Sequence, residues 1–457
     1  MQYQKQLDAM RTFFRTGETR SVKFRIKNLQ ALQASIFRSE NAITAALFAD
    51  LKKSPEEAYA SEIGLVLSEI REAIRMLDTW MQPETVATNL VNLPSRSKIY
   101  RDPLGVVLII APWNYPFQLL LNPLIGALAG GNCAVVKPSE HAPATAQVLA
   151  TILRDALPEN IVCMIQGEGE KILPEMITAF RFDHIFYTGS IPVGRSIYEL
   201  AAKQLVPVTL ELGGKSPCIV EASANLRVAA KRIVLGKFLN AGQTCIAPDY
   251  VLVAAAVKEP LVAHLKAAIN RFYSQEPANS REYPRIINEK RFDRLLDYLA
   301  EGKLLFGGAS NRSALYIGPT LLEPFRMDSP VMKEEIFGPI LPIISYAHTE
   351  EARAVIRENP NPLAFYLFTS DRQSEADWIR NTEFGGGCIN NTVWHFANKN
   401  LPFGGVGNSG TGQYHGKYSF DTFTRQKAVL KTPVWFDPSI KYPPLKGRLG
   451  FLKWIFK

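Results

Sequence analysis

Apolar residues recur with helical spacing over the first eighty residues of the chain. Residues 54–57 (SPEE) have the form of a capping box with proline at the first helical position. Apolar side chains then follow at intervals of three and four residues, at Ile63, Leu67, Ile70, Ile74 and Leu77. This pattern predicts helices over residues 3–81, ending with a long amphipathic stretch that starts at the capping box.

The pattern changes beyond residue 104 to short apolar runs separated by helical stretches. The runs cover residues 104–110, 133–136, 161–165, 184–187 and 206–212. Strands that are apolar on both faces and alternate with helices are typical of a parallel, doubly wound sheet, which commonly binds a nucleotide. A second alternation of helices and strands, from about 225 to 395, predicts a second α/β domain.

The segment 84–101 interrupts the helical pattern. It is rich in Thr, Val, Asn and Ser around Pro94. We expect an extended hairpin here, which is a candidate contact with another subunit.

Two glycine-containing segments are candidates for binding the phosphates of a dinucleotide. The only Gly-x-Gly-x-x-Gly is residues 405–410, and it follows Leu-Pro-Phe rather than a buried strand, so we interpret it as a turn. Residues 186–194 instead follow a predicted strand and open a helix, where free backbone N–H groups bind anions. The sequence therefore predicts the phosphate site at residues 186–194.

Composition indicates an ordinary globular enzyme. At 457 residues, with 47% hydrophobic and 21% charged residues, the chain is long enough for two or three domains. The polar amino terminus has no apolar secretory core, so we expect a cytoplasmic protein. Five cysteines without a Cys-x-x-Cys pair or nearby histidine pairs argue against a disulfide framework and predict no metal site.

The net charge of +9 does not indicate a nucleic-acid partner. Residues 441–457 carry five lysines and arginines and no acid, which leaves the rest of the chain at +4 with its charges intermixed. This tail is too short and too charged to span a bilayer, which takes about 20 apolar residues. Its aromatic residues and lysines suit peripheral contact with a membrane surface, whereas a segment folded over its own or a partner subunit, or a disordered one, is an open alternative.

Cys245 and Glu211 are the strongest candidates for chemistry. A cysteine thiolate attacks a carbon, and a carboxylate activates water, so the two together suit a covalent oxidation or an acyl transfer. An ordinary cysteine has a pKa of about 8.5, so Cys245 needs help from a helix terminus or nearby dipoles. The other four cysteines are interpreted as small buried side chains.

The chain resembles the NAD(P)-dependent aldehyde dehydrogenases in seven motifs that occur in the order of that family and cover nearly the whole chain. They are residues 111–116 (APWNYP), 137–140 (KPSE), 188–190 (TGS), 211–215 (ELGGK), 242–245 (GQTC), 335–339 (EIFGP) and 402–405 (PFGG). The shorter amino terminus and the segments 245–250 and 414–423 resemble the class 3 branch, which includes fatty and aromatic aldehyde dehydrogenases.

The resemblance implies an α/β fold with a doubly wound, Rossmann-like domain, an α/β catalytic domain and a small β bridging element, usually paired as a homodimer. The implied NAD(P)-binding domain covers residues 1–82 and 102–210, and the catalytic domain covers 211–398. The bridging and oligomerisation element covers 83–101 and 399–435, and the basic tail covers 436–457.

The resemblance also implies catalytic roles. Cys245 attacks the aldehyde, and the side-chain amide of Asn114 with the backbone N–H of Cys245 binds the oxyanion. Glu211 activates the water that hydrolyses the thioester, which argues against a coenzyme A-acylating relative, and Glu335 is a second candidate for that base. Without the other motifs, Asn114 reads as a helix cap.

Further positions match residues that bind cofactor or substrate in the family. Lys137 and Glu140 hold the adenosine ribose, and a carboxylate there favours NAD, although the branch often accepts NADP as well. The remaining cofactor positions are Trp113, Gly189, Ser190, Gly213, Glu335 and Phe337, and the substrate positions are Tyr115, Ile246 and Phe403.

We therefore expect oxidation of hydrophobic aldehydes to carboxylic acids, with medium- or long-chain aliphatic aldehydes first and aromatic or polyene aldehydes as the alternative. A cysteine-dependent esterase or acyltransferase needs Cys245 and Glu211 but not the cofactor residues. A non-enzymatic scaffold predicts lost catalytic residues, and none is lost.

Overall fold

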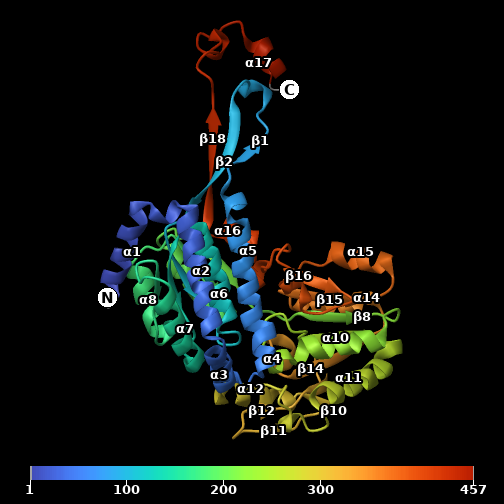
Figure 1. The fold of residues 1–457 in the computed structure, drawn as a ribbon. Coiled ribbons are helices and arrows are strands. Elements are labelled where there is room, and N and C mark those ends of the chain that lie inside the picture. Colours follow the sequence, from blue (N-terminus) through green and yellow to red (C-terminus); the bar gives the residue numbers. More distant parts are fainter. Residues whose placement is uncertain (1–2, 456–457) are drawn as a thin grey trace.

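The computed structural model describes residues 3–455, and helices occupy most of residues 4–81 (Figure 1). They are α1 (Gln4–Thr16), α2 (Val22–Arg38), α3 (Glu40–Leu51), α4 (Pro55–Ala58) and α5 (Gly64–Met81). The predicted capping box forms in part, because the Ser54 hydroxyl accepts a hydrogen bond from the backbone N–H of Glu57 at 3.1 Å. One π-helical turn, Tyr59–Ile63, joins α4 to α5.

The first sheet is doubly wound, as predicted. Its strands are β3 (Val106–Ile110), β4 (Cys133–Lys137), β5 (Val162–Met164), β6 (His184–Thr188) and β7 (Val208–Glu211), all parallel, with the short antiparallel β17 (Gly410–Thr411) at one edge. The order is β17-β7-β6-β3-β4-β5. Strands β4 and β5 are added on one side of β3, and β6 and β7 on the other, so the strand order reverses between β3 and β6. Such sheets bind ligands at the carboxyl ends of the strands beside this point.

Helices cover both faces of this sheet. They are α6 (Gln118–Gly130), α7 (Pro143–Ala156), α8 (Gly169–Ala179) and α9 (Ile191–Ala202), together with α1, α2 and α5 from the amino-terminal segment. β3 is buried on both faces: Val107 and Ile109 pack with α5 and α6 in the larger core, whereas Val106 and Leu108 pack with α1 and α8. This two-sided burial explains why the strand reads as a continuous apolar run.

The second sheet has the order β10-β13-β14-β9-β8-β15-β16. Its strands are β8 (Pro217–Val220), β9 (Tyr250–Ala254), β10 (Gly302–Phe306), β13 (Thr320–Pro324), β14 (Ile340–Tyr346), β15 (Ala364–Phe368) and β16 (Gly386–Ile389). All pairs are parallel except β10 with β13. The second α/β unit predicted over residues 225–395 is therefore present, and it begins slightly earlier, at β8.

Helices and one small ribbon complete this second unit. The helices are α10 (Leu226–Phe238), α11 (Lys258–Tyr273), α12 (Glu289–Leu299), α13 (Pro330–Lys333), α14 (Thr349–Glu358) and α15 (Arg372–Asn381), and the ribbon pairs β11 (Ser310–Asn311) with β12 (Tyr316–Ile317). Figure 1 shows this unit beside the first one, with α5 running along the boundary between them.

A three-stranded antiparallel arm projects from the two units (Figure 1). It consists of β1 (Glu84–Val86), β2 (Arg96–Pro103) and β18 (Thr424–Lys431), so the predicted hairpin over 84–101 is confirmed. Residues 410–422 belong to the same predicted bridging segment as β18 but lie elsewhere: β17 pairs with β7, and α16 (Lys417–Thr422) packs on α6.

The chain continues past the arm into the basic tail, which contains α17 (Leu449–Ile455). Phe456 and Lys457, the last residues of the predicted tail, lie outside the described residues. Between residues 3 and 455, no helix is both long and apolar enough to cross a membrane.

Candidate active site

Cys245 follows a strained turn in the second unit. Asn240, Ala241 and Gly242 have left-handed backbone conformations with φ of 51°, 51° and 76°. A Cβ atom at Gly242 would lie 2.2 Å from the carbonyl oxygen of Gly338, so the close packing requires glycine. Two non-glycine residues in this conformation cost on the order of 1–3 kcal/mol each, and such strain is concentrated at functional sites.

Gln243 holds this turn in place with both ends of its side-chain amide. Its Nε2 donates to the carbonyl oxygens of Asn240 (3.1 Å) and Arg285 (2.9 Å), and its Oε1 accepts from the backbone N–H of Ile287 (3.0 Å). The thiol of Cys245 is thereby set on a rigid loop rather than a mobile one.

Two cavities meet at Cys245 and Glu211. The first has a volume of about 620 Å³, counted out into open solvent, and is lined mostly by apolar side chains. The second, counted in the same way, has about 760 Å³ and more polar groups in its lining. Both cavities are lined by Cys245, Glu211, Thr188, Leu119 and Leu212. The thiol and the carboxylate therefore form part of the wall between the two spaces, where groups entering from either side can meet.

Glu211 ends β7 and is buried without any compensating partner. Neither oxygen of its carboxyl group accepts or donates a hydrogen bond within the described residues. Burial raises the pKa of Glu211 well above its ordinary value. A buried carboxyl group with no cationic neighbour is costly to the fold, which is the usual signature of a side chain retained for chemistry.

Glu335 lies across the second cavity, against the backbone of Gly213. A Cβ atom at Gly213 would fall 2.2 Å from the Glu335 carboxylate, so a larger residue there would displace the Glu335 side chain. Burial raises the pKa of Glu335 to about 8, with a further upward contribution from Asp249, while the Gly214 backbone, Arg291 and Lys215 act in the opposite direction. Glu335 thus has cationic neighbours that Glu211 lacks.

The same carboxylates shape the titration of the cysteine. Burial raises the pKa of the Cys245 thiol to about 12, and Glu335 and Glu211 add to the increase. The backbone N–H groups of Cys245 and Ile246 lower the thiol pKa, and they are the nearby dipoles expected from the sequence. Their effect on the pKa is smaller than that of burial. In this form of the protein, Cys245 is held as a thiol at neutral pH.

Asn114 lies beside Cys245 in the second cavity. Its side-chain Nδ2 donates to the carbonyl oxygen of Gln243 at 3.0 Å, and its Oδ1 is buried without a partner. The nearest helix, α6, has Phe117 as its N-cap and no side-chain capping bond. Asn114 is therefore not a helix cap; it is tied to the loop that carries the cysteine.

The three predicted substrate residues, Tyr115, Ile246 and Phe403, all line the first cavity. The Tyr115 hydroxyl is hydrogen-bonded to the Thr244 hydroxyl at 2.7 Å. Sequence reasoning missed most of the remaining lining, to which several elements contribute: Ser61, Leu119, Leu239, Val393, Phe396, Tyr414 and His415. Leu239 lies close to motif 242–245, and Tyr414 and His415 lie in the segment 414–423 that resembles the class 3 branch, but no local pattern marks the others.

The predicted cofactor residues divide into two groups. Trp113, Gly189, Ser190, Gly213, Glu335 and Phe337 line the second cavity. Ser190 is the N-cap of α9 but makes no side-chain capping bond. Arg291 lines the same wall and was not predicted, whereas Thr188 belongs to the predicted segment 186–194 but was not singled out. Among the described residues, the Thr188 hydroxyl is buried without a partner.

Lys137 and Glu140 lie outside this cavity, at the carboxyl end of β4. Their side chains pair at 2.6 Å, and the other oxygen of Glu140 accepts from the backbone N–H of Gly169 at 3.0 Å. The Lys137 side chain is buried, whereas Glu140 is partly exposed. Together with the glycine-lined cavity near α9, these residues fit an extended dinucleotide along the sheet edge.

The Gly-x-Gly-x-x-Gly segment forms a turn, as interpreted from the sequence. Residues Gly407–Ser409 form a single 3-10 turn, and Gly410 pairs with Glu211 across β17 and β7. A Cβ atom at Gly405 would lie 2.2 Å from the Ser409 carbonyl oxygen, so the glycines serve close packing. This segment therefore supports Glu211 rather than binding phosphate.

Comparison with known proteins gives consistent matches over almost the whole chain. The model of the aldehyde dehydrogenase family matches residues 1–429. A 4,4'-diaponeurosporen-aldehyde dehydrogenase of Staphylococcus aureus is 46% identical over 98% of this chain and 97% of its own. A dimeric, NADP-preferring aldehyde dehydrogenase of Rattus norvegicus is 41% identical over 96% of this chain and 97% of its own. The substrate-bound structure of Staphylococcus aureus AldH superposes with a TM-score of 0.97 at 45% identity, covering 99% of both chains.

Proposed function

Since the chain belongs to the aldehyde dehydrogenase family and is an NAD(P)-dependent oxidoreductase, we propose that it converts hydrophobic aldehydes to carboxylic acids through a thioester on Cys245. The proposal rests on one observation: the two cavities share a wall that contains Cys245 and Glu211. Cys245 and Glu211 border both the first cavity, whose apolar lining suits an aldehyde, and the second cavity, whose lining has more polar groups and suits a nicotinamide.

The first half of the reaction belongs to Cys245 and Asn114. The thiolate of Cys245 forms a C–S bond to the aldehyde carbon, and the carbonyl oxygen takes up the negative charge. The amide of Asn114 has two N–H donors, of which one is bound to the Gln243 carbonyl oxygen. The second donor and the backbone N–H of Cys245 then stabilise the oxyanion, and one such donor contributes roughly two to three orders of magnitude in rate.

A nicotinamide held by the residues of the second cavity would supply hydride acceptance, and Cys245 would then carry a thioester. We propose Glu211 as the main base of the second half, because it has two free carboxylate oxygens and no cationic neighbour. Ionised Glu211 takes a proton from water, the hydroxide attacks the thioester carbon, and the C–S bond breaks to release the acid and the thiolate. Glu335, beside Arg291 and Lys215, is assigned to the cofactor side.

Residues along the edge of the first sheet support the proposal that NAD is preferred. The carboxylate of Glu140, held by Lys137 and the Gly169 backbone, accepts hydrogen bonds from a ribose 2′-hydroxyl and repels a 2′-phosphate. Lys137 offsets part of that repulsion, and the rat relative is named as NADP-preferring. We therefore expect NADP to be accepted at lower efficiency.

The apolar cavity supports a hydrophobic substrate. Leu119, Ile246, Phe396 and Phe403 contribute to its lining, and a ligand that fills such a site gains about 25 cal/mol per Å² of apolar surface removed from water. Medium- or long-chain aliphatic aldehydes fit this lining. The Staphylococcus aureus relative, named for a diaponeurosporen aldehyde, makes an extended polyene aldehyde the second candidate.

The arm supports a homodimer. Val434 and Trp435, which follow β18, are 97% and 77% exposed in the single chain. Large apolar side chains at the end of a projecting sheet are covered most simply by a second copy of the same surface. The rat relative is named as dimeric.

The basic tail 441–457 remains a proposed contact with an anionic membrane surface. Leu449 and Trp454 are exposed on α17, which carries Lys453 in its last turn. Removing residues 441–457 should abolish cosedimentation with anionic vesicles; equal binding by the shortened chain would contradict the proposal.

A panel of aldehydes of varied chain length and aromaticity, tested with both NAD and NADP, examines the proposed function directly. NADH formation should be greatest with hydrophobic aldehydes, and Cys245→Ala should abolish it while retaining NAD binding. Ester cleavage without any NADH formation would instead favour the cysteine-dependent esterase.

A further inference from the structure

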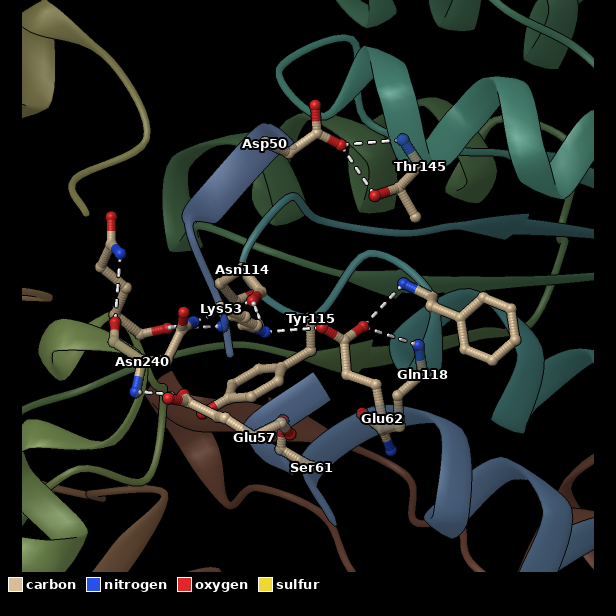
Figure 2. A network of polar contacts seen from close by, with 12 residues as sticks. Asp50, Lys53, Glu57, Ser61, Glu62, Asn114, Tyr115, Gln118, Thr145 and Asn240 are labelled. Carbon is tan, nitrogen blue, oxygen red and sulfur yellow. Dashed lines mark hydrogen bonds and ion pairs between the residues drawn. The ribbon is translucent and has the colours of Figure 1, made fainter. Parts of the chain in front are cut away.

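A buried polar network lies directly behind the loop that carries Asn114 (Figure 2). Its centre is Lys53, which joins α3 to α4 and is 0% exposed. The Lys53 Nζ donates to Glu62 at 2.6 Å and to the backbone carbonyl oxygen of Asn114 at 2.9 Å, and it lies 4.0 Å from the centroid of the Tyr115 ring. One buried cation thus contacts two consecutive residues of the proposed active site.

Glu62 connects this cation to the start of α6. Its second carboxylate oxygen accepts from the backbone N–H groups of Phe117 (2.9 Å) and Gln118 (3.2 Å). Glu62 lies in the π-helical turn Tyr59–Ile63, a type of irregularity that occurs frequently at functional sites. The preceding residue, Ser61, lines the apolar cavity.

The same Asn114 carbonyl oxygen is held from the opposite side by the cysteine loop. Asn240 Nδ2 donates to it at 2.8 Å and also approaches the carbonyl oxygen of Gln243 at 3.2 Å (Figure 2). The side chain of Asn114 returns to that loop through its own bond to Gln243. The main chain of Asn114 is therefore clamped between Lys53 and Asn240, at the junction of the two α/β units.

A gain in stability does not by itself explain why Lys53 and Glu62 are buried as an ion pair. Taking two charges out of water costs about as much as their attraction returns, and uncharged replacements of similar shape are often neutral. The hydrogen bonds that the pair makes to 114, 117 and 118 have instead a directional effect, because they set the path of the main chain between β3 and α6.

We propose that Lys53, with Glu62 as its buried counter-ion, is a positioning residue that holds the Asn114 amide in register with Cys245. The role rests on the proposed function of Asn114 as an oxyanion donor. Neither Lys53 nor Glu62 touches the substrate in this arrangement. Both act through the main chain, where a displacement of about 1 Å costs up to about a hundredfold in rate.

The double variant Lys53→Met/Glu62→Gln separates positioning from stability. It removes both members of the Lys53–Glu62 pair, and the new glutamine side chain still offers an oxygen to the N–H groups of Phe117 and Gln118. Buried Glu57, whose pKa Lys53 lowers, also loses this cation and becomes easier to protonate. The matched control is Lys52→Met/Glu56→Gln, which changes two exposed neighbours in the same way. Both proteins are compared with the wild type by thermal unfolding and by NAD affinity.

Two rates then test the proposal. Formation of NADH in the first turnover depends on the oxyanion donor, whereas in alkylation by iodoacetamide the Cys245 sulfur displaces iodide from a CH2 carbon and no oxyanion forms. For Lys53→Met/Glu62→Gln we expect NADH formation to fall about 10- to 100-fold while alkylation and NAD affinity stay within about twofold. The control should match the wild type in every measurement.

Two outcomes would overturn the role of Lys53. One is first-turnover NADH formation within about twofold of wild type in a folded double variant. The other is a parallel fall in alkylation, which would mean general distortion of the loop. Failure of the proposed function is distinguishable from both, because the wild-type protein would then form no NADH from any aldehyde.

Discussion

Cys245 is chemically unusual because its surroundings oppose ionisation. With the thiol pKa raised to about 12, the reactive thiolate is a small fraction at neutral pH and increases about tenfold for each pH unit. We therefore expect iodoacetamide to alkylate Cys245 in the cofactor-free protein more slowly than free cysteine at about pH 8, with a rate that rises steadily to about pH 10.

Mass spectrometry of the Cys245 peptide measures this rate. Cys133, Cys163 and Cys218 are buried and provide internal controls that should stay unmodified. Alkylation faster than that of free cysteine would contradict the environment described for the thiol.

Glu211 provides the second residue-scale prediction. Glu211→Gln keeps the size of the side chain but cannot take a proton from water, so thioester hydrolysis should slow by roughly 10²- to 10⁴-fold while the first turnover proceeds. Stopped-flow absorbance should show a burst of NADH followed by almost no steady-state formation. Because base catalysis requires the carboxylate, and burial raises its pKa, wild-type hydrolysis should become faster as pH rises.

Glu335→Gln is the matched comparison, because it changes the other carboxylate near the thiol. An unchanged steady state in Glu211→Gln together with a burst in Glu335→Gln would transfer the base role to Glu335.

Between elements, the contact of α5 with the start of α16 depends on a buried carboxyl group. Glu69 of α5 accepts a hydrogen bond from the backbone N–H of Gly416 at 2.6 Å. Burial raises the pKa of Glu69 from 4.5 to about 7, although the Gly416 bond and Lys399 act against the increase. Between pH 4.5 and about 7, the folded chain keeps a proton on Glu69 that the unfolded chain releases. The free energy of unfolding therefore decreases as pH rises through this range. Above about pH 7, Glu69 causes no further change.

Glu69→Gln keeps an acceptor for Gly416 and removes the titration. We expect the free energy of unfolding of the variant, relative to wild type, to increase by about 1.4 kcal/mol per pH unit between about pH 5 and 7. Urea unfolding at several pH values measures the difference. Parallel pH dependence in the two proteins would show that Glu69 does not titrate in this range.

At the scale of the whole molecule, we expect dimerisation to depend on the exposed apolar residues that follow β18 at the end of the projecting arm. Val434→Ser/Trp435→Ser removes the apolar surface proposed to be covered by a second chain. Sedimentation velocity should show a dimer for the wild type and at least about tenfold weaker association for the variant, because the lost burial is central to the contact. The turnover of each active site should be retained, since these residues lie outside both cavities.

Leu205→Ser is a suitable control for the arm variant. Leu205 is 86% exposed but lies between α9 and β7, away from the arm. A wild-type monomer, or equal association in all three proteins, would contradict the role of the arm.

Local patterns in the sequence determined the strands of the first sheet, the hairpin 84–101 and the motifs around Cys245 and Glu211. These features can be predicted from the sequence because helix and strand periodicities, capping boxes and turns depend on residues only a few positions apart. The resemblance of the motifs to the family also assigned the predicted binding residues to either the substrate or the cofactor.

Only the tertiary structure decided that Cys245 and Glu211 share the wall of two cavities, that β17 pairs beside Glu211, and that Lys53 and Asn240 clamp one carbonyl oxygen of Asn114. Lys53 lies 61 residues from Asn114 in the sequence, and Asn240 lies 126 residues away. A lysine in a polar connection ordinarily reads as a solvated surface residue. Its burial follows from the way the turn 59–63 and the loops that carry Asn114 and Asn240 come together beside it, which no local pattern encodes.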